Sequence, residues 1–298
     1  MNNGFRIDTE INRLHTLKQT KQAALNALQE YDAEWNSIHF IQVSEHVTFR
    51  IESGEGEKFL LRIHPESKSQ EETLSELEWL VALRRKGLVV PEAVLNREGV
   101  FVTDTATSGG HRYYATLLKW VEGERLDKKA LTEMSIRKMG TLLANLHEAS
   151  ADFCPNIGFM RPSWGSVSFQ RDWEHLQRFH CHFISDEAFE LYTMAVAKVA
   201  NHLDTFEPNE ANYGIIHADL HNGNIVFRDD EPYAIDFGRC GFGYHLYDMA
   251  QSIMGLLPLQ RALFIGGYEQ VRKMEDDAIP ILESFFRHDW RAVYVPTT

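Results

Sequence analysis

The chain has 298 residues, and its 44% hydrophobic and 24% charged content is typical of a folded, water-soluble protein whose length suits two lobes with a sizeable core. A formal net charge of −13 argues against nucleic acid and anionic membranes as partners, and it favours a cationic substrate slightly. No apolar run approaches the roughly 18 residues of a membrane span. The first residues lack a signal-peptide core and the three cysteines are scattered, so we expect a cytoplasmic protein.

The first third of the chain alternates between helical and strand-like periods. A charged segment with one apolar face comes first, and an alternating hairpin around a Gly-containing turn follows it. A Glu-rich helix, which Pro91 ends, and two further strand-like runs complete this part. The expected elements are a helix over 8–31, strands over 47–51 and 59–63, a helix over 69–86, and strands over 100–103 and 112–118. This order is that of the amino-terminal lobe of a kinase.

The rest of the chain is predicted to be mostly helical. Apolar residues recur every three or four positions from Ile136 to Leu146 and from Phe189 to Leu203, which predicts two helices whose apolar faces belong to the core. Between them, the aromatic segment from Phe153 to Trp173 contains Pro and Gly, and we expect it to be an irregular loop on the substrate side.

The pattern that indicates chemistry lies between residues 214 and 238. Two short apolar strands flank a polar loop that presents Asp219 and, five residues later, Asn224, while Asp236 ends the next apolar run. Phosphoryl transfer from ATP needs one carboxylate to orient the attacking hydroxyl and accept its proton, and an amide oxygen and a second carboxylate to hold Mg²⁺ on the phosphates. We therefore predict Asp219 as the catalytic residue, and Asn224 and Asp236 as the metal ligands.

A metallohydrolase is the alternative interpretation of the same loop. His217, Asp219 and His221 alternate, so on an extended segment they would share one face, as metal ligands do. A zinc site, however, needs three or four His, Cys or carboxylate ligands and usually a second cluster. The sequence has no CxxC and no such cluster nearby, which makes this the weaker interpretation.

The full loop string narrows the family. His217-Ala-Asp-Leu-His-Asn-Gly-Asn-Ile225 resembles the His-Gly-Asp-Leu-His-Pro-Gly-Asn-Ile signature of the aminoglycoside phosphotransferase and choline kinase-like family, with Ala218 in place of Gly and Asn222 in place of Pro. Ile235-Asp-Phe-Gly238 and Gly243-Tyr-His-Leu-Tyr-Asp-Met-Ala250 resemble the motif that follows in this family.

The resemblance implies a bilobal, protein-kinase-like α+β fold. It has a five-stranded antiparallel amino-terminal lobe with one inserted helix, and a mainly helical carboxy-terminal lobe. We expect the first lobe, including an amino-terminal helix, over 1–118, a hinge over 119–123, and the catalytic and substrate lobe over 124–298. The implied cofactors are ATP and Mg²⁺, and the implied partner is a small molecule with a hydroxyl group, such as an aminoglycoside or an amino alcohol.

Kinases need a cation on the third strand that binds the phosphates, held by a Glu on the next helix. Arg62 occupies that strand position, and Arg keeps the charge while differing from Lys in reach and planarity. Lys58 is the second candidate on the same strand. The helix partner is predicted to be Glu76, with Glu78 as its rival.

The remaining nucleotide contacts come from a turn and a hinge. The turn Val43–Val47 contains no Gly, and the hydroxyl of Ser44 or the backbone amides would cap a phosphate there. The string that ends in Trp120-Val-Glu-Gly123 resembles the family's hinge, so adenine is expected to lie against the backbone of Lys119, Trp120 and Val121.

Four polar residues are given supporting roles by the resemblance. His217 is expected to brace the loop through backbone contacts, and His221 to pack within it. Asp248 is expected at the start of a helix, where it orders the loop without touching substrate, and His147 is expected to be a packed polar residue.

Two further functions share the fold. A Ser/Thr protein kinase is one, although the chain lacks an Ala-Pro-Glu activation segment. A nucleotide-binding pseudokinase is the other, since Arg62 and the Gly-free turn would reduce turnover, although Asp219, Asn224 and Asp236 are all present.

Overall fold

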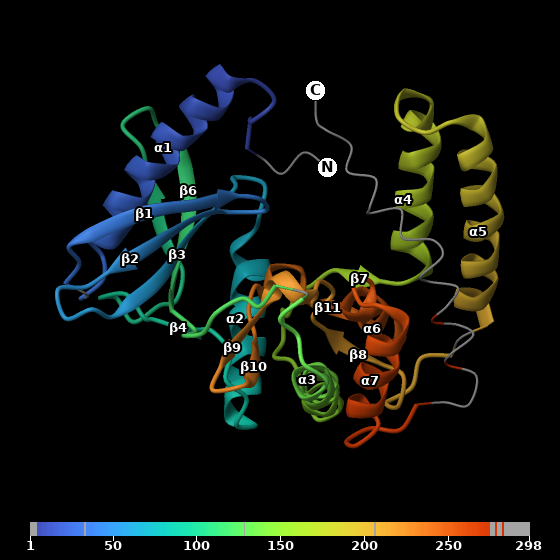
Figure 1. Ribbon diagram of the computed structural model, residues 1–298. Helices are drawn as coiled ribbons and strands as arrows, with labels where there is room; N and C mark the ends of the chain where they lie inside the picture. Colours follow the sequence, from blue (N-terminus) through green and yellow to red (C-terminus); the bar gives the residue numbers. More distant parts are fainter. Residues whose placement is uncertain are drawn as a thin grey trace. The chain divides into compact units, whose positions relative to one another are not determined.

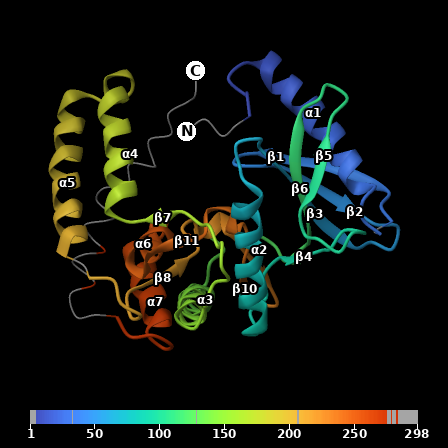
Figure 2. The same cartoon turned by 180° about the vertical axis from the view of Figure 1, so that it is seen from behind.

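The computed structural model describes residues 5–274 except 33, 128 and 206, together with 278 and 282. The chain divides into two compact units. Of the described residues, the first unit contains those up to Val121 and Pro155–Met160, and the second contains those of Glu122–Cys154 and those from Arg161 onward. Figures 1 and 2 show the elements of both units from opposite sides.

The first unit is built on a six-stranded antiparallel sheet with the order β1-β2-β3-β6-β4, in which β5 also pairs with β6. The expected hairpin is β2 and β3, and Arg62 of β3 lies opposite Thr48 on one side and Thr116 on the other. The strands are β1 Ser37–Val43, β2 Val47–Glu52, β3 Lys58–His64, β4 Glu92–Ala93, β5 Thr103–Ala106 and β6 Arg112–Lys119. One strand more is present than the five expected, because the two-residue β4 joins the edge beyond β6.

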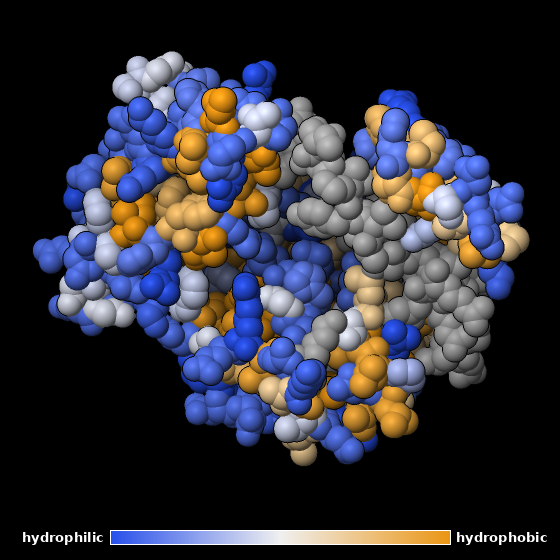
Figure 3. Space-filling view, turned by 45° about the horizontal axis from the view of Figure 1, so that its top comes forward, coloured by the Kyte–Doolittle hydropathy of each residue, from blue (hydrophilic) through white to orange (hydrophobic). Residues whose placement is uncertain are grey.

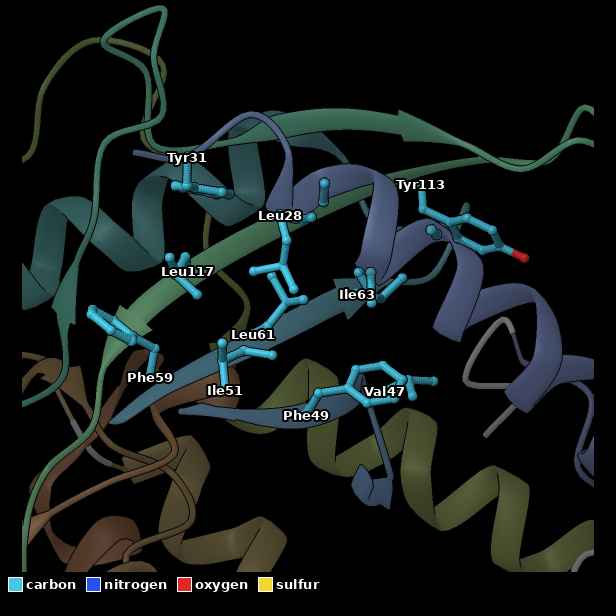
Figure 4. Close-up of a cluster of buried hydrophobic side chains, with 14 of the residues drawn as sticks. Leu28, Tyr31, Val47, Phe49, Ile51, Phe59, Leu61, Ile63, Tyr113 and Leu117 are labelled. Carbon is cyan, nitrogen blue, oxygen red and sulfur yellow. The ribbon is translucent and has the colours of Figure 1, made fainter. Parts of the chain in front are cut away.

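Helix α1 (Glu10–Leu28) covers one face of this sheet. Alternate residues of β3, namely Phe59, Leu61 and Ile63, are buried in a cluster that includes Leu28 of α1 (Figure 4). Burying each hydrophobic side chain of this size stabilises the fold by about 1.5–3 kcal/mol. Because successive strand residues point to opposite faces, Arg62 lies on the other face of the sheet.

Helix α2 (Gln70–Arg85) begins with a capping box between Ser69 and Glu72. Its end at Arg85 agrees with the predicted range 69–86, but the residue that ends it is a glycine and not Pro91. Gly87 has a φ of 85°, its amide donates to the carbonyl of Arg84, and the amide of Leu88 donates to the carbonyl of Leu83. These two bonds satisfy the last carbonyls of the helix, so a glycine C-cap ends it before the proline is reached.

The strand predicted over 100–103 is misplaced. The side-chain carbonyl of Asn96 accepts hydrogen bonds from the amides of Glu98 and Val100 at 3.0 and 3.1 Å. This turn keeps the chain out of the sheet, and β5 begins only at Thr103.

The second unit is mainly helical, with two small groups of strands. In one group β11 lies between β7 and β8, and in the other β9 and β10 form a hairpin. The helices are α3 Glu133–Ala151, α4 Ser166–Phe179, α5 Asp186–Thr205, α6 His245–Ile253 and α7 Pro258–Tyr268; the strands are β7 Ser163–Trp164, β8 Tyr213–Ile216, β9 Ile225–Arg228, β10 Glu231–Ala234 and β11 Gly241–Tyr244.

Helices α3 and α7 pack closely because each has a glycine at the contact. A Cβ on Gly140 would lie 2.0 Å from the carbonyl oxygen of Phe264, and a Cβ on Gly267 would lie 2.0 Å from that of Arg137. Any larger residue at either position would push the helices apart, so this contact fixes α3, which carries His147, against α7.

The segment predicted as an irregular loop over 153–173 contains the start of α4, at Ser166. Its helical period, with Phe169, Trp173 and Leu176 at i, i+4 and i+7, is present in the sequence, but the Pro and Gly residues before it favoured an irregular loop. These three side chains pack against Val196 of α5. Figures 1 and 2 show α4 and α5 side by side.

In the part of the chain that the structure describes, no helix combines the length and hydrophobicity needed to cross a membrane. Figure 3 shows hydrophilic side chains over much of one face, with hydrophobic ones gathered in smaller patches.

Candidate functional site

The loop between β8 and β9 brings Asp219 and Asn224 into contact. The Nδ2 amide of Asn224 donates to the backbone carbonyl of Asp219 at 2.9 Å and to its Oδ2 at 3.2 Å. These bonds use the amide nitrogen and fix which end of the Asn224 side chain faces Asp219, so the amide oxygen faces the other way. The Asp219 side chain is 30% exposed, which leaves its carboxylate accessible to a substrate.

Asp236 lies at the same end of the β9–β10 hairpin as Asn224. Asn224 directly precedes β9 and Asp236 follows β10 by one residue, and Ala234 pairs with Ile225 across the two antiparallel strands. The amide of Ile235 donates to the carbonyl of Asn224 at 2.9 Å, which extends the pairing by one step. An antiparallel hairpin therefore brings together two residues that are twelve positions apart in the sequence.

The donor set formed by Asn224 and Asp236 suits Mg²⁺. An amide oxygen and a carboxylate are hard oxygen ligands, and Mg²⁺ uses only a few protein ligands because it keeps water and substrate phosphates in its shell. Within the described residues, no group of three or more His, Cys, Asp or Glu side chains is placed to hold a metal ion.

The two histidines of the loop bind backbone groups. His217 is buried and its Nε2 lies 3.0 Å from the carbonyl oxygen of Ile235, to which it donates. The Nδ1 of His221 accepts from the amide of Gly223 at 2.9 Å. The contact of His217 matches the bracing role expected for it, whereas His221, expected to pack within the loop, bonds a loop amide with its side chain 49% exposed. The metallohydrolase interpretation needs a third ligand beside these residues, and the described residues provide no such group.

Asp248, in the first turn of α6, holds the start of the loop. Its Oδ2 accepts from the amide of His217 and its Oδ1 from the amide of Ala218, both at 2.8 Å. Asp248 is fully buried, and Ala218 has a φ of 61°, which a non-glycine residue adopts only when its surroundings hold it there. Asp248 thus orders the loop from outside it, as the sequence predicted.

A buried hydrogen-bonded chain supports Asp248. The Nε2 of His147 lies 3.2 Å from Asp248 Oδ2, and its Nδ1 lies 2.9 Å from the hydroxyl of Tyr268. Burial alone would raise the pKa of Asp248, but the hydrogen bonds from His147 and from the loop backbone outweigh burial and lower that pKa. A charged carboxylate only accepts, so His147 donates from Nε2 and accepts from Tyr268 at Nδ1.

The imidazoles of His147 and His245 are stacked, with ring centroids 4.2 Å apart. Burial lowers the pKa of His147, and burial followed by repulsion from His147 lowers the pKa of His245 to about 2. Both rings are therefore neutral in the folded protein at neutral pH, which is compatible with their close stacking.

In the first unit, Arg62 and Glu76 form a buried ion pair, with Nη1 of Arg62 donating to Oε1 of Glu76 at 2.7 Å. Their side chains are 4% and 1% exposed, so this pair is shielded from solvent. The two alternative candidates for this pair make other contacts. Glu78 accepts from the amide of Asn156 at 2.8 Å. Lys58 is the first residue of β3, and its carbonyl accepts from the amide of Trp120.

Lys68 is a residue that the sequence interpretation missed. Its Nζ lies 3.8 Å from Oε2 of Glu76, so one carboxylate faces two cations and the group carries a net positive charge. Lys68 lies on the loop before α2, whereas the cation of the kinase pattern lies on the third strand. Its position next to the N-cap Ser69 of an acidic helix was the available signal.

The predicted turn and hinge residues are also in the first unit. The amide of Ser44 donates to the carbonyl of His46 at 2.9 Å in the turn between β1 and β2. Lys119 ends β6, and the amide of Trp120 is already bonded to Lys58, so of the three predicted hinge residues Trp120 does not offer its N–H to a ligand. Val121 is the last residue before the boundary of the two units.

The glycine of the predicted hinge motif, Gly123, lies where a side chain would not fit. Its φ is 151°, and a Cβ there would lie 2.9 Å from the carbonyl oxygen of Phe227. The next residue, Glu124, pairs with Phe227 through both backbone hydrogen bonds. Gly123 therefore lets the chain approach β9, the strand that follows Asn224.

Comparison with known proteins gives one family. The sequence model of the phosphotransferase enzyme family matches residues 39–277. A homoserine kinase of Beijerinckia indica subsp. indica is 27% identical over 239 residues, which cover 75% of this chain and 69% of that enzyme.

Two solved structures are similar in fold. The microcompartment-associated aminopropanol kinase has a TM-score of 0.72 and 27% identity, covering 88% of this chain and 84% of that one. An amicoumacin kinase in complex with AMP-PNP, Ca²⁺ and Ami has a TM-score of 0.74 and 17% identity, covering 96% of this chain and 85% of that one. The fold is therefore the kinase-like fold expected from the sequence.

Proposed function

The chain belongs to the phosphotransferase enzyme family, and we propose that it transfers a phosphoryl group from ATP, with Mg²⁺, to a hydroxyl group of a small molecule. The observation that carries the proposal is the contact between Asp219 and Asn224 at the end of the hairpin that also carries Asp236. This arrangement supplies a carboxylate for the acceptor hydroxyl beside two oxygen ligands for a metal. The relative solved with AMP-PNP and Ca²⁺ supports the use of a nucleotide and a divalent ion.

In this proposal the residues of the loop have distinct tasks. The partly exposed carboxylate of Asp219 orients the acceptor hydroxyl and accepts its proton as the new bond to phosphorus forms. Asn224 fixes that carboxylate through Nδ2 and offers its amide oxygen, with Asp236, to the metal. When bound, Mg²⁺ neutralises charge on the phosphate oxygens. Kinase catalysis is mostly positioning and charge stabilisation, so the order that Asp248 imposes on the loop is part of the activity.

The acceptor that we propose is an amino alcohol. Homoserine and aminopropanol, named for two relatives of 27% identity, each carry an amino group and a hydroxyl. The net charge of −13 favours cationic small molecules near the protein. ATP consumption with amino alcohols, and its absence with amine-free sugars and with protein substrates, is the observation that checks this choice.

Asp236→Ala tests the metal site. We expect ATP to raise the thermal unfolding midpoint of the wild-type protein further when Mg²⁺ is present, because binding to the folded state stabilises it. The variant should lose the Mg²⁺-dependent part of the shift, since its carboxylate ligand is gone. Differential scanning fluorimetry with Mg²⁺ and with EDTA measures both parts. A variant that retained the full metal dependence would show that Asp236 is not a ligand.

Arg62→Ala tests the strand cation, which we propose to bind the nucleotide phosphates. A charge-assisted hydrogen bond contributes about 1.5–3 kcal/mol, so the Michaelis constant for ATP should rise by about tenfold or more and turnover should fall. Lys58→Ala, the matched control on the same strand, should change either constant by less than about twofold because Lys58 has no part in the buried pair. The reverse ranking of the two variants in steady-state kinetics would reject Arg62.

A further inference from the structure

The turn that follows Asp236 has its carbonyl groups bound by side chains from a distant segment. Arg161 donates from Nη2 to the carbonyl of Gly238 at 2.5 Å and from Nε to the carbonyl of Cys240 at 2.6 Å. Trp164 donates from Nε1 to the carbonyl between them, that of Arg239, at 3.0 Å. Three successive carbonyls are therefore held by two side chains that lie more than seventy residues earlier in the chain.

Asp236 needs such support because of its backbone conformation. Its φ and ψ are 65° and 64°, in the left-handed region, and the single 3₁₀ turn Phe237–Arg239 follows it directly. A residue other than glycine in this region persists only where its surroundings hold it. A single turn also leaves its last carbonyls without partners inside the helix, and side chains must satisfy them.

The two donors are themselves fixed. Residues of β7 pair in parallel with β11, and the amide of Phe242 donates to the carbonyl of Pro162 at 2.9 Å. A Cβ on Gly241 would lie 2.3 Å from that same carbonyl oxygen, so the two segments are in close contact. Trp164 is 9% exposed. The guanidinium of Arg239 lies 4.6 Å from the centroid of the Trp164 ring, and the ring of Tyr247 is stacked on Trp164 with a centroid distance of 6.2 Å.

We propose that Arg161 and Trp164 are positioning residues for the Asp236 carboxylate. They clamp the carbonyls of the turn that follows Asp236, and the clamp holds Asp236 in the left-handed conformation from which it binds the divalent metal of the nucleotide complex. The inference rests on the proposed function and deepens it, because it assigns the geometry of the metal ligand to a segment that lies outside the loop motifs. Neither residue touches the nucleotide or the acceptor in this role.

The test is a Mg²⁺ titration of the 298-residue chain at a fixed concentration of AMP-PNP, read as the shift in thermal unfolding midpoint. Residues that orient a metal ligand typically contribute a factor of about 10–100 in metal affinity. Arg161→Met should therefore raise the Mg²⁺ concentration at half-maximal shift by on the order of tenfold. Arg161→Lys, which keeps a donor for one carbonyl, should recover part of this loss, and Trp164→Phe, which removes only the indole donor, should show a smaller increase.

Arg272→Met is the matched control. Arg272 also donates to two neighbouring backbone carbonyls, those of Glu210 and Ala211 at 2.8 and 3.0 Å, and it pairs with Glu148, all away from the Asp236 turn. The Arg272→Met variant should have a lower thermal unfolding midpoint without nucleotide. The Mg²⁺ concentration at half-maximal shift should be the same as in the wild type. Steady-state kinetics should show the same distinction, with only the Arg161 and Trp164 variants regaining turnover as Mg²⁺ is raised.

The outcomes separate the inference from the proposed function. If the wild type shows Mg²⁺-dependent stabilisation and both Arg161→Met and Trp164→Phe titrate like the wild type, the clamp has no role in metal binding and the inference is overturned. Equal shifts in Arg161→Met and Arg272→Met would overturn it as well, since loss of stability alone would explain them. If the wild type itself shows no Mg²⁺-dependent effect of nucleotide, the proposed function fails and the inference fails with it. If Arg161→Met does not fold, Trp164→Phe decides.

Discussion

Asp219→Asn should lower turnover by roughly 10²–10⁴-fold, the usual contribution of general-base assistance, while the fold and ATP binding are retained. Asp219 is the only acidic residue between His217 and Asn224, so no neighbouring carboxylate on the loop can replace it. The amide that replaces the carboxylate is nearly the same size, so it still fits beside Asn224, but it cannot take up the acceptor's proton.

Steady-state kinetics on an amino alcohol that proves to be an acceptor measures this effect. The Michaelis constant for ATP should change little, because an interaction made mainly in the transition state is lost. His221→Ala is the control: its side chain is half exposed, its Nδ1 bonds the local amide of Gly223, and its Nε2 makes only long contacts, 3.5 Å to Nδ2 of Asn224 and 4.0 Å to Oδ2 of Asp219, so it should lose far less turnover than Asp219→Asn. If Asp219→Asn kept more than about a tenth of wild-type turnover, the loss would be too small for a general base, and the kinase interpretation of the loop would be wrong.

The parts of the site that the sequence predicted are those set by short-range pattern. Asp219 and Asn224 are five residues apart on one loop, and an antiparallel hairpin necessarily returns Asp236 to the end where Asn224 lies. The position of Arg62 could be predicted because alternate residues of β3 are apolar and are buried against α1. Arg62 therefore lies on the opposite face of the sheet, where it pairs with Glu76 of α2. In each case the alternation of residues along one strand, or the path of one loop or hairpin, determines where the side chain lies.

The parts that were missed depend on contacts between distant segments or on side chains that compete with the backbone pattern. Arg161 and Trp164 lie more than seventy residues before the turn that they bind, and the periodicity of neighbouring residues does not predict a contact between segments so far apart in the sequence. The start of α4 was missed although its apolar residues have the helical period, because the Pro and Gly residues just before it favoured a loop. The late start of β5 follows from one side chain, Asn96, which binds two amides that a strand would otherwise have used.

Asp248 shows why the loop motif alone does not define the site. The residues it binds, His217 and Ala218, are thirty positions earlier, and its carboxylate takes three donors at once: two loop amides and the Nε2 of His147. All the partners are donors. Even Asp248→Asn, which keeps the shape of the side chain, therefore sets an amide NH₂ against a donor and removes the buried charge that the three bonds stabilise.

Each buried hydrogen bond to a charged group contributes about 1.5–3 kcal/mol, and weakening the three bonds of the Asp248 carboxylate in a protein of this size lowers the thermal unfolding midpoint by roughly 10 °C. We expect Asp248→Asn to show this loss, and to lose turnover as well, since the strained backbone at Ala218 is released and Asp219 with it. Ser252→Ala is the matched control: Ser252 is buried on the same helix and donates to the carbonyl of Asp248, but it makes one neutral bond worth about 1 kcal/mol. Calorimetry on both variants makes the comparison. An Asp248→Asn protein that melted no lower than Ser252→Ala would mean that the loop holds its shape without this carboxylate.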